Sequence, residues 1–177
     1  MPATYELKYQ DGRVEEHFGH RGYYYVLEAD TLLSFFPIPA WCRNCDAITL
    51  AEDLQKPEQI KSEIKELETP GSARFPSSPE ARVAYQSYLE GRLALLARRK
   101  SPPRCMKCGK AEVTFFVSGE WSPHPKTGEL IMFSAVGMCS TNFAMRFFNP
   151  EGEELTLTEI EQEHYDSLAK SQGFFCV

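Results

Sequence analysis

Hydrophobic and polar residues alternate in the first two runs of the chain, 4–9 and 13–18. Asp11 and Gly12 lie between these runs and are typical of a type I′ turn, so the pattern predicts an antiparallel β-hairpin. The next run, 23–27, is apolar or aromatic throughout and predicts a buried strand. The start of the chain is therefore expected to be mainly sheet.

Helix signals occupy the middle of the chain. Asp30 can cap a short helix over 31–36, and a capping-box pattern predicts another short helix from Thr49. A third helix should begin at Pro57, and the longest should follow Ser78 and run to about residue 99. Apolar residues recur at helical spacing in the last two and predict their buried faces: Ile60, Ile64 and Leu67, then Tyr85, Tyr88, Leu89, Leu93 and Leu96.

The last third of the chain has strand-like runs at 112–117, 129–136 and 141–148, followed by a capped helix from Thr158 to about residue 170. Because no helix separates these runs, they predict an antiparallel meander. Adjacent aromatics such as Phe115 and Phe116 point to opposite faces of a strand. Either both faces of the sheet are covered, or some aromatics form a surface for a partner.

Two cysteine pairs are the strongest motif: Cys42 and Cys45, then Cys105 and Cys108, each with two residues between. Four thiolates supplied as two such turns form the ligand set of a closed tetrahedral zinc site. Gly109 follows the second pair and Asp46 the first, and both residue types tolerate the positive φ that turns backbone amides toward the sulfurs. Redox chemistry and an iron–sulfur centre are the alternatives for these cysteines.

The two pairs enclose 59 residues, 46–104. A metal that closes so long a loop strongly constrains the unfolded chain. The predicted fold is α+β in a single domain over 1–177. It consists of an N-terminal β-hairpin, a helical insert over 46–104 and a C-terminal antiparallel sheet, held together by a four-cysteine site like a zinc ribbon.

The segment 99–109, RKSPPRCMKCG, together with 41–45, WCRNC, resembles small bacterial proteins of unassigned function that carry a split four-cysteine zinc ribbon. The resemblance implies a zinc ribbon in a bacterial cytoplasmic protein and transfers no activity. Those proteins also carry a His-Pro-Gly-Cys-Gly-Gly turn. This chain offers only His124-Pro125 and a separate Cys139, so the resemblance implies no second metal feature.

Composition narrows the function classes. With a net charge of −6, the chain suits a basic protein partner better than nucleic acid, whose phosphates require clustered Lys and Arg. No apolar run approaches the roughly 18 residues of a membrane span, and the N-terminus has no signal-peptide pattern. We therefore expect a cytoplasmic protein without membrane contact. Thiols stay reduced there, which favours metal binding over disulfides.

Three functions remain open. The first is a non-enzymatic protein-binding module, such as an immunity or antitoxin-like inhibitor of a basic toxin, or an adaptor. The second is nucleic-acid binding through one basic cluster beside the second cysteine pair: Arg98, Arg99, Lys100, Arg104, Lys107 and Lys110. The third is a metal- or thiol-dependent hydrolase using His17, His20 or His124 with Cys139. His164 and Cys176 are expected to be solvated and buried, respectively.

Overall fold

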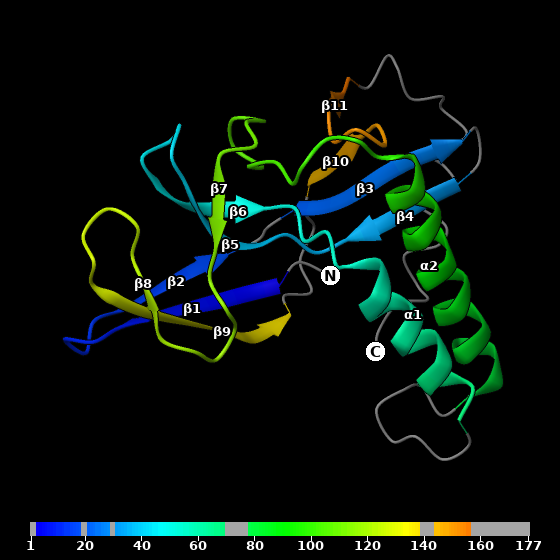
Figure 1. The fold of residues 1–177 in the computed structure, drawn as a ribbon, viewed down its shortest axis with the longest axis horizontal. Coiled ribbons are helices and arrows are strands. Elements are labelled where there is room, and N and C mark those ends of the chain that lie inside the picture. Colours follow the sequence, from blue (N-terminus) through cyan, green and yellow to red (C-terminus); the bar gives the residue numbers. More distant parts are fainter. Residues whose placement is uncertain (1–2, 19–20, 29–30, 70–77, 139–143, 157–177) are drawn as a thin grey trace.

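The structure, a computed structural model, describes residues 3–18, 21–28, 31–69, 78–138 and 144–156 (Figure 1). The elements of these residues, in chain order, are β1 (Ala3–Tyr9), β2 (Val14–Phe18), β3 (Arg21–Glu28), β4 (Thr31–Phe35), β5 (Ile38–Cys42), β6 (Ala47–Ala51), α1 (Pro57–Leu67), α2 (Pro79–Arg98), β7 (Val113–Phe115), β8 (Ser122–Pro123), β9 (Leu130–Met138), β10 (Ala144–Phe148) and β11 (Glu154–Leu155).

The strands form three sheets. The hairpin sheet has the order β2-β1-β9-β8, the tyrosine sheet β11-β10-β3-β4, and the knuckle sheet β6-β5-β7. In Figure 1 the knuckle sheet lies between the other two, and the two helices lie side by side at the right, next to β4. The predicted α+β class is confirmed.

The predicted N-terminal hairpin is also confirmed. β1 and β2 pair antiparallel, with Tyr5 opposite His17 and Lys8 opposite Val14. The turn between them contains Gly12 with φ 88°, a conformation that costs glycine little because it has no Cβ.

The predicted C-terminal meander is wrong. β9 pairs antiparallel with β1 in the hairpin sheet, whereas β10 pairs parallel with β3 in the tyrosine sheet. Consecutive strands of the last third therefore belong to different sheets. Their sequences predict strands but carry no signal for the long-range partner.

Two predicted short helices are strands. Residues 31–36 contain β4, which pairs antiparallel with β3, and the segment from Thr49 lies in β6, which pairs with β5. In both cases pairing with a neighbouring strand overrides a weak local helix signal. The insert over 46–104 accordingly begins with a strand and continues into α1 and α2.

The two longer helices match their prediction. Pro57 and Pro79 are the first residues of α1 and α2, and the Ser78 side chain accepts a hydrogen bond from the Ala81 backbone N–H at 3.1 Å. Leu89 is buried as expected, but Leu95 and Arg92 complete the most buried part of α2. The helix is rotated relative to the predicted stripe.

Hydrophobic packing joins the sheets in two main cores. One contains Tyr5, Leu7, Trp41, Phe116 and Ile131 among others, between the hairpin and knuckle sheets. The other joins the tyrosine sheet to α2 and to Met106, between the cysteines of the second pair. On the opposite face of the tyrosine sheet, buried Phe147 packs with the partly buried Tyr24, so each face of that sheet carries a buried aromatic side chain.

The predicted helix from Thr158 and the residues His20, Cys139, His164 and Cys176 lie outside the described residues. No helix among the described residues combines the length and apolarity that crossing a membrane requires.

Candidate metal centre

The knuckle sheet positions the first cysteine pair. Cys42 is the last residue of β5, and a tight turn through Cys45 leads into β6. In this turn the Asp46 N–H donates to the Arg43 carbonyl at 3.3 Å. Asp46 has φ 50°, which confirms the positive φ predicted for this position.

The second pair is fixed to the end of β6. Cys105 forms an isolated antiparallel bridge with Ala51, and the Met106 N–H donates to the Leu50 carbonyl at 2.9 Å. Gly109 closes the second turn with φ 70° and donates to the Cys105 carbonyl at 2.9 Å. Two cysteine turns from distant parts of the chain therefore meet at one end of the same sheet.

All four cysteines are brought together as predicted. The sulfurs of Cys42, Cys45, Cys105 and Cys108 lie within 4.8 Å of one another. Two of the pairs, Cys42 with Cys108 and Cys45 with Cys105, are separated by 3.6 Å and 3.9 Å. A tetrahedral site with Zn–S bonds of about 2.3 Å places its sulfurs about 3.8 Å apart. The observed spacing fits such a site, and the cluster can hold a metal ion.

Polar groups around the sulfurs add to this fit. The Lys107 backbone N–H donates to the Cys105 sulfur at 3.4 Å, and the Thr49 hydroxyl lies 3.2 Å from the same atom. N–H and O–H groups directed at a thiolate stabilise its charge and fix its orientation toward a metal. Thr49 thus supports the Cys105 sulfur. The sequence gives no sign of this role, because its pattern at Thr49 predicts the start of a helix.

The pKa values of three of these thiols, Cys42, Cys45 and Cys108, are shifted. Burial raises the pKa of Cys42, and burial together with the neighbouring sulfurs raises that of Cys45. Burial also raises the pKa of Cys108, but the Lys110 backbone N–H and the other cysteines outweigh it and lower this pKa to about 7. Four thiolates at such separations repel one another, so the full ligand set requires a cation.

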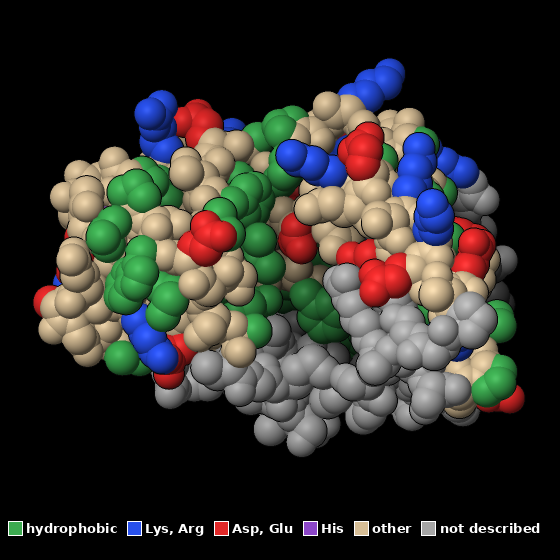
Figure 2. All heavy atoms as spheres, turned by 60° about the horizontal axis from the view of Figure 1, so that its bottom comes forward, with side chains coloured by type: hydrophobic (Ala, Val, Ile, Leu, Met, Phe, Trp, Pro, Cys, Tyr) green, Lys and Arg blue, Asp and Glu red, His purple; other side chains and the backbone are tan. Residues whose placement is uncertain are grey.

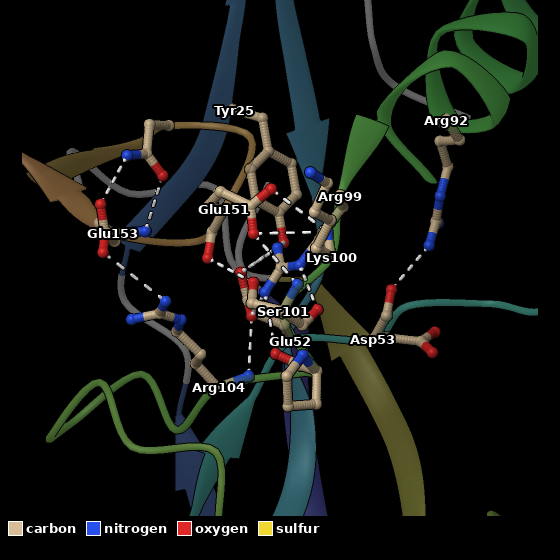
Figure 3. A network of polar contacts seen from close by, with 12 residues as sticks. Tyr25, Glu52, Asp53, Arg92, Arg99, Lys100, Ser101, Arg104, Glu151 and Glu153 are labelled. Carbon is tan, nitrogen blue, oxygen red and sulfur yellow. Dashed lines mark hydrogen bonds and ion pairs between the residues drawn. The ribbon is translucent and has the colours of Figure 1, made fainter. Parts of the chain in front are cut away.

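A buried ion pair between Glu52 and Arg99 lies next to this site, because Glu52 directly follows Ala51, which bridges Cys105. Figure 3 shows the network around this ion pair. The side chains of Glu52 and Arg99 are 0% and 1% exposed, and the closest of their contacts is 2.5 Å. The Glu52 carboxylate also accepts hydrogen bonds from the Tyr25 hydroxyl at 2.6 Å and from the Arg104 N–H at 2.7 Å. Burial raises the pKa of Tyr25, and the Glu52 carboxylate raises it further.

This network links four parts of the fold. Glu52 follows β6, Arg99 follows α2, Tyr25 belongs to β3, and Arg104 directly precedes the second cysteine pair. The Glu52 N–H also donates to the Arg104 carbonyl at 3.0 Å. The insert is therefore fixed to the four-cysteine cluster at both of its ends.

The turn between β10 and β11 covers the ion pair. Its Glu151 carboxylate accepts hydrogen bonds from the backbone N–H groups of Lys100 and Ser101, the latter at 3.0 Å (Figure 3). These contacts satisfy backbone groups just after α2 ends. They also lower the pKa of Glu151, chiefly through the Lys100 N–H.

The six residues of the predicted basic cluster are not equivalent. Arg99 is committed to the buried ion pair, and Arg104 is half-buried, with its guanidinium 3.7 Å from the Glu153 carboxylate. The other four are exposed at this end of the molecule: Arg98, Lys100, Lys107 and Lys110. A phosphate at the surface can meet these four side chains but not Arg99.

Of the four residues of the predicted hydrolase site, His124 alone has a side chain within the described part of the structure. His124 lies in a turn, where its Nδ1 accepts hydrogen bonds from the N–H groups of Lys126 and Thr127 at 3.2 Å and 3.1 Å. Its ring contacts Trp41 at a centroid distance of 4.4 Å. His17 lies in β2, and its side chain is outside the described part of the structure.

Comparison of the chain with family models, curated proteins and solved structures gives no match.

Proposed function

We propose that the four cysteines hold a structural Zn²⁺ and that the chain is a non-enzymatic protein-binding module. The observation that carries the proposal is the closed set of four sulfurs at tetrahedral spacing. In such a site the protein fills every coordination position and leaves none for a substrate or an activated water. The role of the metal is then to join the two ends of the insert.

The net negative charge of the chain indicates which class of protein it binds. The chain carries 25 Asp and Glu residues against 19 Lys and Arg. An acidic surface attracts a basic protein and accelerates its association. An immunity or antitoxin-like inhibitor of a basic toxin, or an adaptor for a basic effector, fits this balance.

Metal analysis of the purified chain tests the structural role. We expect about one zinc per chain, and a melting temperature that falls sharply when a chelator removes it. Cys108→Ser should lose the metal, whereas Cys176→Ser, a thiol outside the four, should retain it. A metal-free chain with an unchanged melting curve would refute the zinc proposal.

Affinity capture tests the binding role. The zinc-loaded chain should retain a basic protein in a fixed ratio, and the retained fraction should fall as salt is raised from about 0.05 to 0.5 M. Purified partner should then rebind with the same salt dependence. If nothing rebinds at low salt, the binding role is wrong even where the zinc result stands.

A second candidate is nucleic-acid binding at the second cysteine pair. The exposed side chains of Lys100, Lys107 and Lys110 support it, and the net charge opposes it. A labelled single-stranded RNA or a DNA duplex should then bind with an affinity that falls steeply with salt. Lys107→Glu with Lys110→Glu should abolish that binding, whereas Lys61→Glu with Lys65→Glu on α1 should not.

A further inference from the structure

Strand β7 has one strand neighbour among the described residues, β5, and forms an edge of the knuckle sheet. The Arg43 N–H donates to the Glu112 carbonyl, and Trp41 lies opposite Thr114. In an antiparallel pair, alternate residues direct their backbone groups to the partner and the intervening residues direct theirs away. The N–H and carbonyl of Phe115 therefore point away from β5, toward the outer edge.

The side chains of residues 115–117, at the end of this strand, alternate between surface and core. Phe116 is 4% exposed and packs with Trp41, whereas Phe115 is 36% and Val117 54% exposed. A turn closed by the Glu120 N–H and the Val117 carbonyl at 3.2 Å, with Gly119 at φ 77°, brings the chain back at Trp121. Trp121 is 49% exposed. Phe115, Val117 and Trp121 are called the β7 patch below.

The β7 patch is unusual for this molecule. Six large hydrophobic side chains are exposed among the described residues, and three of them lie within these seven positions. Figure 2 shows hydrophobic side chains gathered on its left half, away from the two helices at the right of Figure 1. Clustered apolar exposure marks an interaction surface more often than scattered single residues do.

The edge is short, at three residues, but it lacks the other usual protections. Natural edge strands carry lysine, proline or a bulge that discourages another strand from pairing. Residues 111–122 contain no Lys, Arg or Pro, and the charged residues among them are Glu112 and Glu120. Both carboxylates are exposed. A strand that approaches β7 therefore meets apolar side chains flanked by negative charge.

We propose that the β7 patch docks an extended basic segment of a partner protein, which adds as a strand to the outer edge of β7. Its apolar side chains pack on Phe115 and Val117, and its Lys or Arg side chains approach Glu112 and Glu120. Main-chain hydrogen bonds supply affinity in this mode, and alternate side chains supply specificity. The proposal rests on the proposed function for the class of partner.

The opposite face of the strand can accept the intervening side chains of such a segment. A cleft of about 480 Å³ lies there, bounded by Trp41, Glu112, Thr114 and Lys126 among others. It can accept both polar and apolar groups, because its lining includes a tryptophan, a threonine and charges of both signs. A partner segment in which lysine alternates with β-branched residues thus suits both the β7 patch and the cleft.

The probe is an eight-residue peptide of alternating lysine and valine, titrated into ¹⁵N-labelled, zinc-loaded protein at low salt. We expect chemical-shift changes confined to residues 111–121 and the neighbouring β5. A peptide N-methylated on alternate residues along one edge should bind at least tenfold more weakly, because it cannot complete the ladder.

Three variants separate surface from fold. Phe115→Ser with Trp121→Ser should weaken peptide binding at least tenfold, whereas Val83→Ser, an equally conservative change at a residue 66% exposed on α2, should leave it unchanged. Glu112→Lys with Glu120→Lys should reverse the preference toward a glutamate–valine peptide. Because both glutamates are exposed, this variant tests the proposal even where the first one misfolds.

The proposal is overturned if the peptide produces no shifts at β7 at millimolar concentration, or if the N-methylated peptide binds equally well. It is also overturned if light scattering shows a dimer that Trp121→Ser dissociates, because a second copy then occupies the edge. If the natural partner is captured equally well by the Phe115→Ser, Trp121→Ser variant, the binding role stands and this site is wrong. If no partner rebinds but the peptide does, the site stands and the binding role is wrong.

Discussion

Gly152 lies where the turn between β10 and β11 meets the buried ion pair. A Cβ at this position would lie 2.6 Å from both Arg99 Nη2 and Glu52 Oε1, and the backbone has φ 74°. Neither ion-pair partner can move aside without losing a hydrogen bond. Gly152→Ala should therefore lower the free energy of unfolding by about 3 kcal/mol, from backbone strain and the clash combined, measured by urea denaturation.

Gly128 supplies the matched control. It has nearly the same φ, 73°, but a Cβ added there would meet no atom within 4 Å. Gly128→Ala should cost only the strain of the backbone, about 1 kcal/mol. Equal losses in the two variants would mean that the ion pair tolerates the extra methyl group.

Asp53 follows the ion-paired Glu52 and is half-buried. Burial raises its pKa, Arg92 lowers it in part, and Glu63 raises it further. A carboxyl whose pKa is raised on folding contributes stability at pH below its unfolded pKa, and this contribution is lost as pH rises through the folded value. At neutral pH the folded state therefore holds an unfavourable charge.

Asp53→Asn should accordingly raise the melting temperature at pH 7 by a few degrees, an effect that should shrink toward pH 3, where both states hold the proton. Asp46→Asn, in an exposed ion pair with Lys126, is the comparison and should not raise it. A stabilisation of Asp53→Asn that is the same at pH 3 and pH 7 contradicts the charge explanation.

Single residues were predictable from sequence where the chemistry is local. The cysteine spacing alone predicts that the four cysteines meet, and the residue after each pair predicts a positive φ, which Asp46 and Gly109 both adopt. The Glu52–Arg99 pair was not predictable, because its members are 47 positions apart and each looks like a surface residue. Arg99 even resembled part of a basic surface cluster.

At the scale of elements, the ion pair is the contact between the end of β6 and the end of α2. Removing one charge of a buried pair leaves the other uncompensated, which costs about 3–5 kcal/mol. Glu52→Gln should therefore reduce the free energy of unfolding by that amount in urea denaturation. The Tyr25 hydroxyl and the Arg104 N–H lose a charged acceptor in the same variant.

Glu6→Gln is the control for that change. Glu6 pairs with Lys8 at 2.9 Å, but their side chains are 22% and 46% exposed. Exposed pairs contribute about 0–1 kcal/mol because solvent screens them. If both glutamine variants lose the same stability, the Glu52–Arg99 pair is not a specific stabiliser of the fold.

Elements were predicted well where their patterns were long. The hairpin and both long helices carry a turn, a cap or a proline at their ends, and their bounds follow from these signals. The sequences of β4 and β6 wrongly predict helices, because five residues contain too few periods to separate the helical pattern from the strand pattern. Their strand pairing with β3 and β5 decided the outcome.

At the scale of the whole molecule, the topology was the least predictable feature. β10 pairs parallel with β3 across more than a hundred residues, and β9 joins β1. The apolar faces of these strands would be buried equally well in several different strand orders. The sequence therefore does not select one strand order. The tyrosine sheet is apolar on both faces: helix α2 packs on one face, and the other carries a cluster of the sheet's own side chains around Phe147.

The four-cysteine cluster and the ion pair fix the same junction. Ala51 bridges Cys105, and the next residue, Glu52, accepts a hydrogen bond from the N–H of Arg104, which precedes Cys105. If either the metal or the ion pair is lost, this junction is already loosened, and losing the second one then costs less stability. Chelation of Glu52→Gln should therefore cost less than chelation of the wild type, by a coupling energy of about 1–2 kcal/mol.

Four melting curves, of wild type and Glu52→Gln with and without chelator, give this coupling energy, and Glu6→Gln gives the additive reference. If metal-free Glu52→Gln is already unfolded, Tyr25→Phe takes the place of Glu52→Gln in the four measurements, because it removes only one hydrogen bond from the Glu52 carboxylate. Additivity within about 0.5 kcal/mol would show that the two features act independently. Coupling would mean that the metal fixes not only its own two turns but also the attachment of the helical insert to the tyrosine sheet.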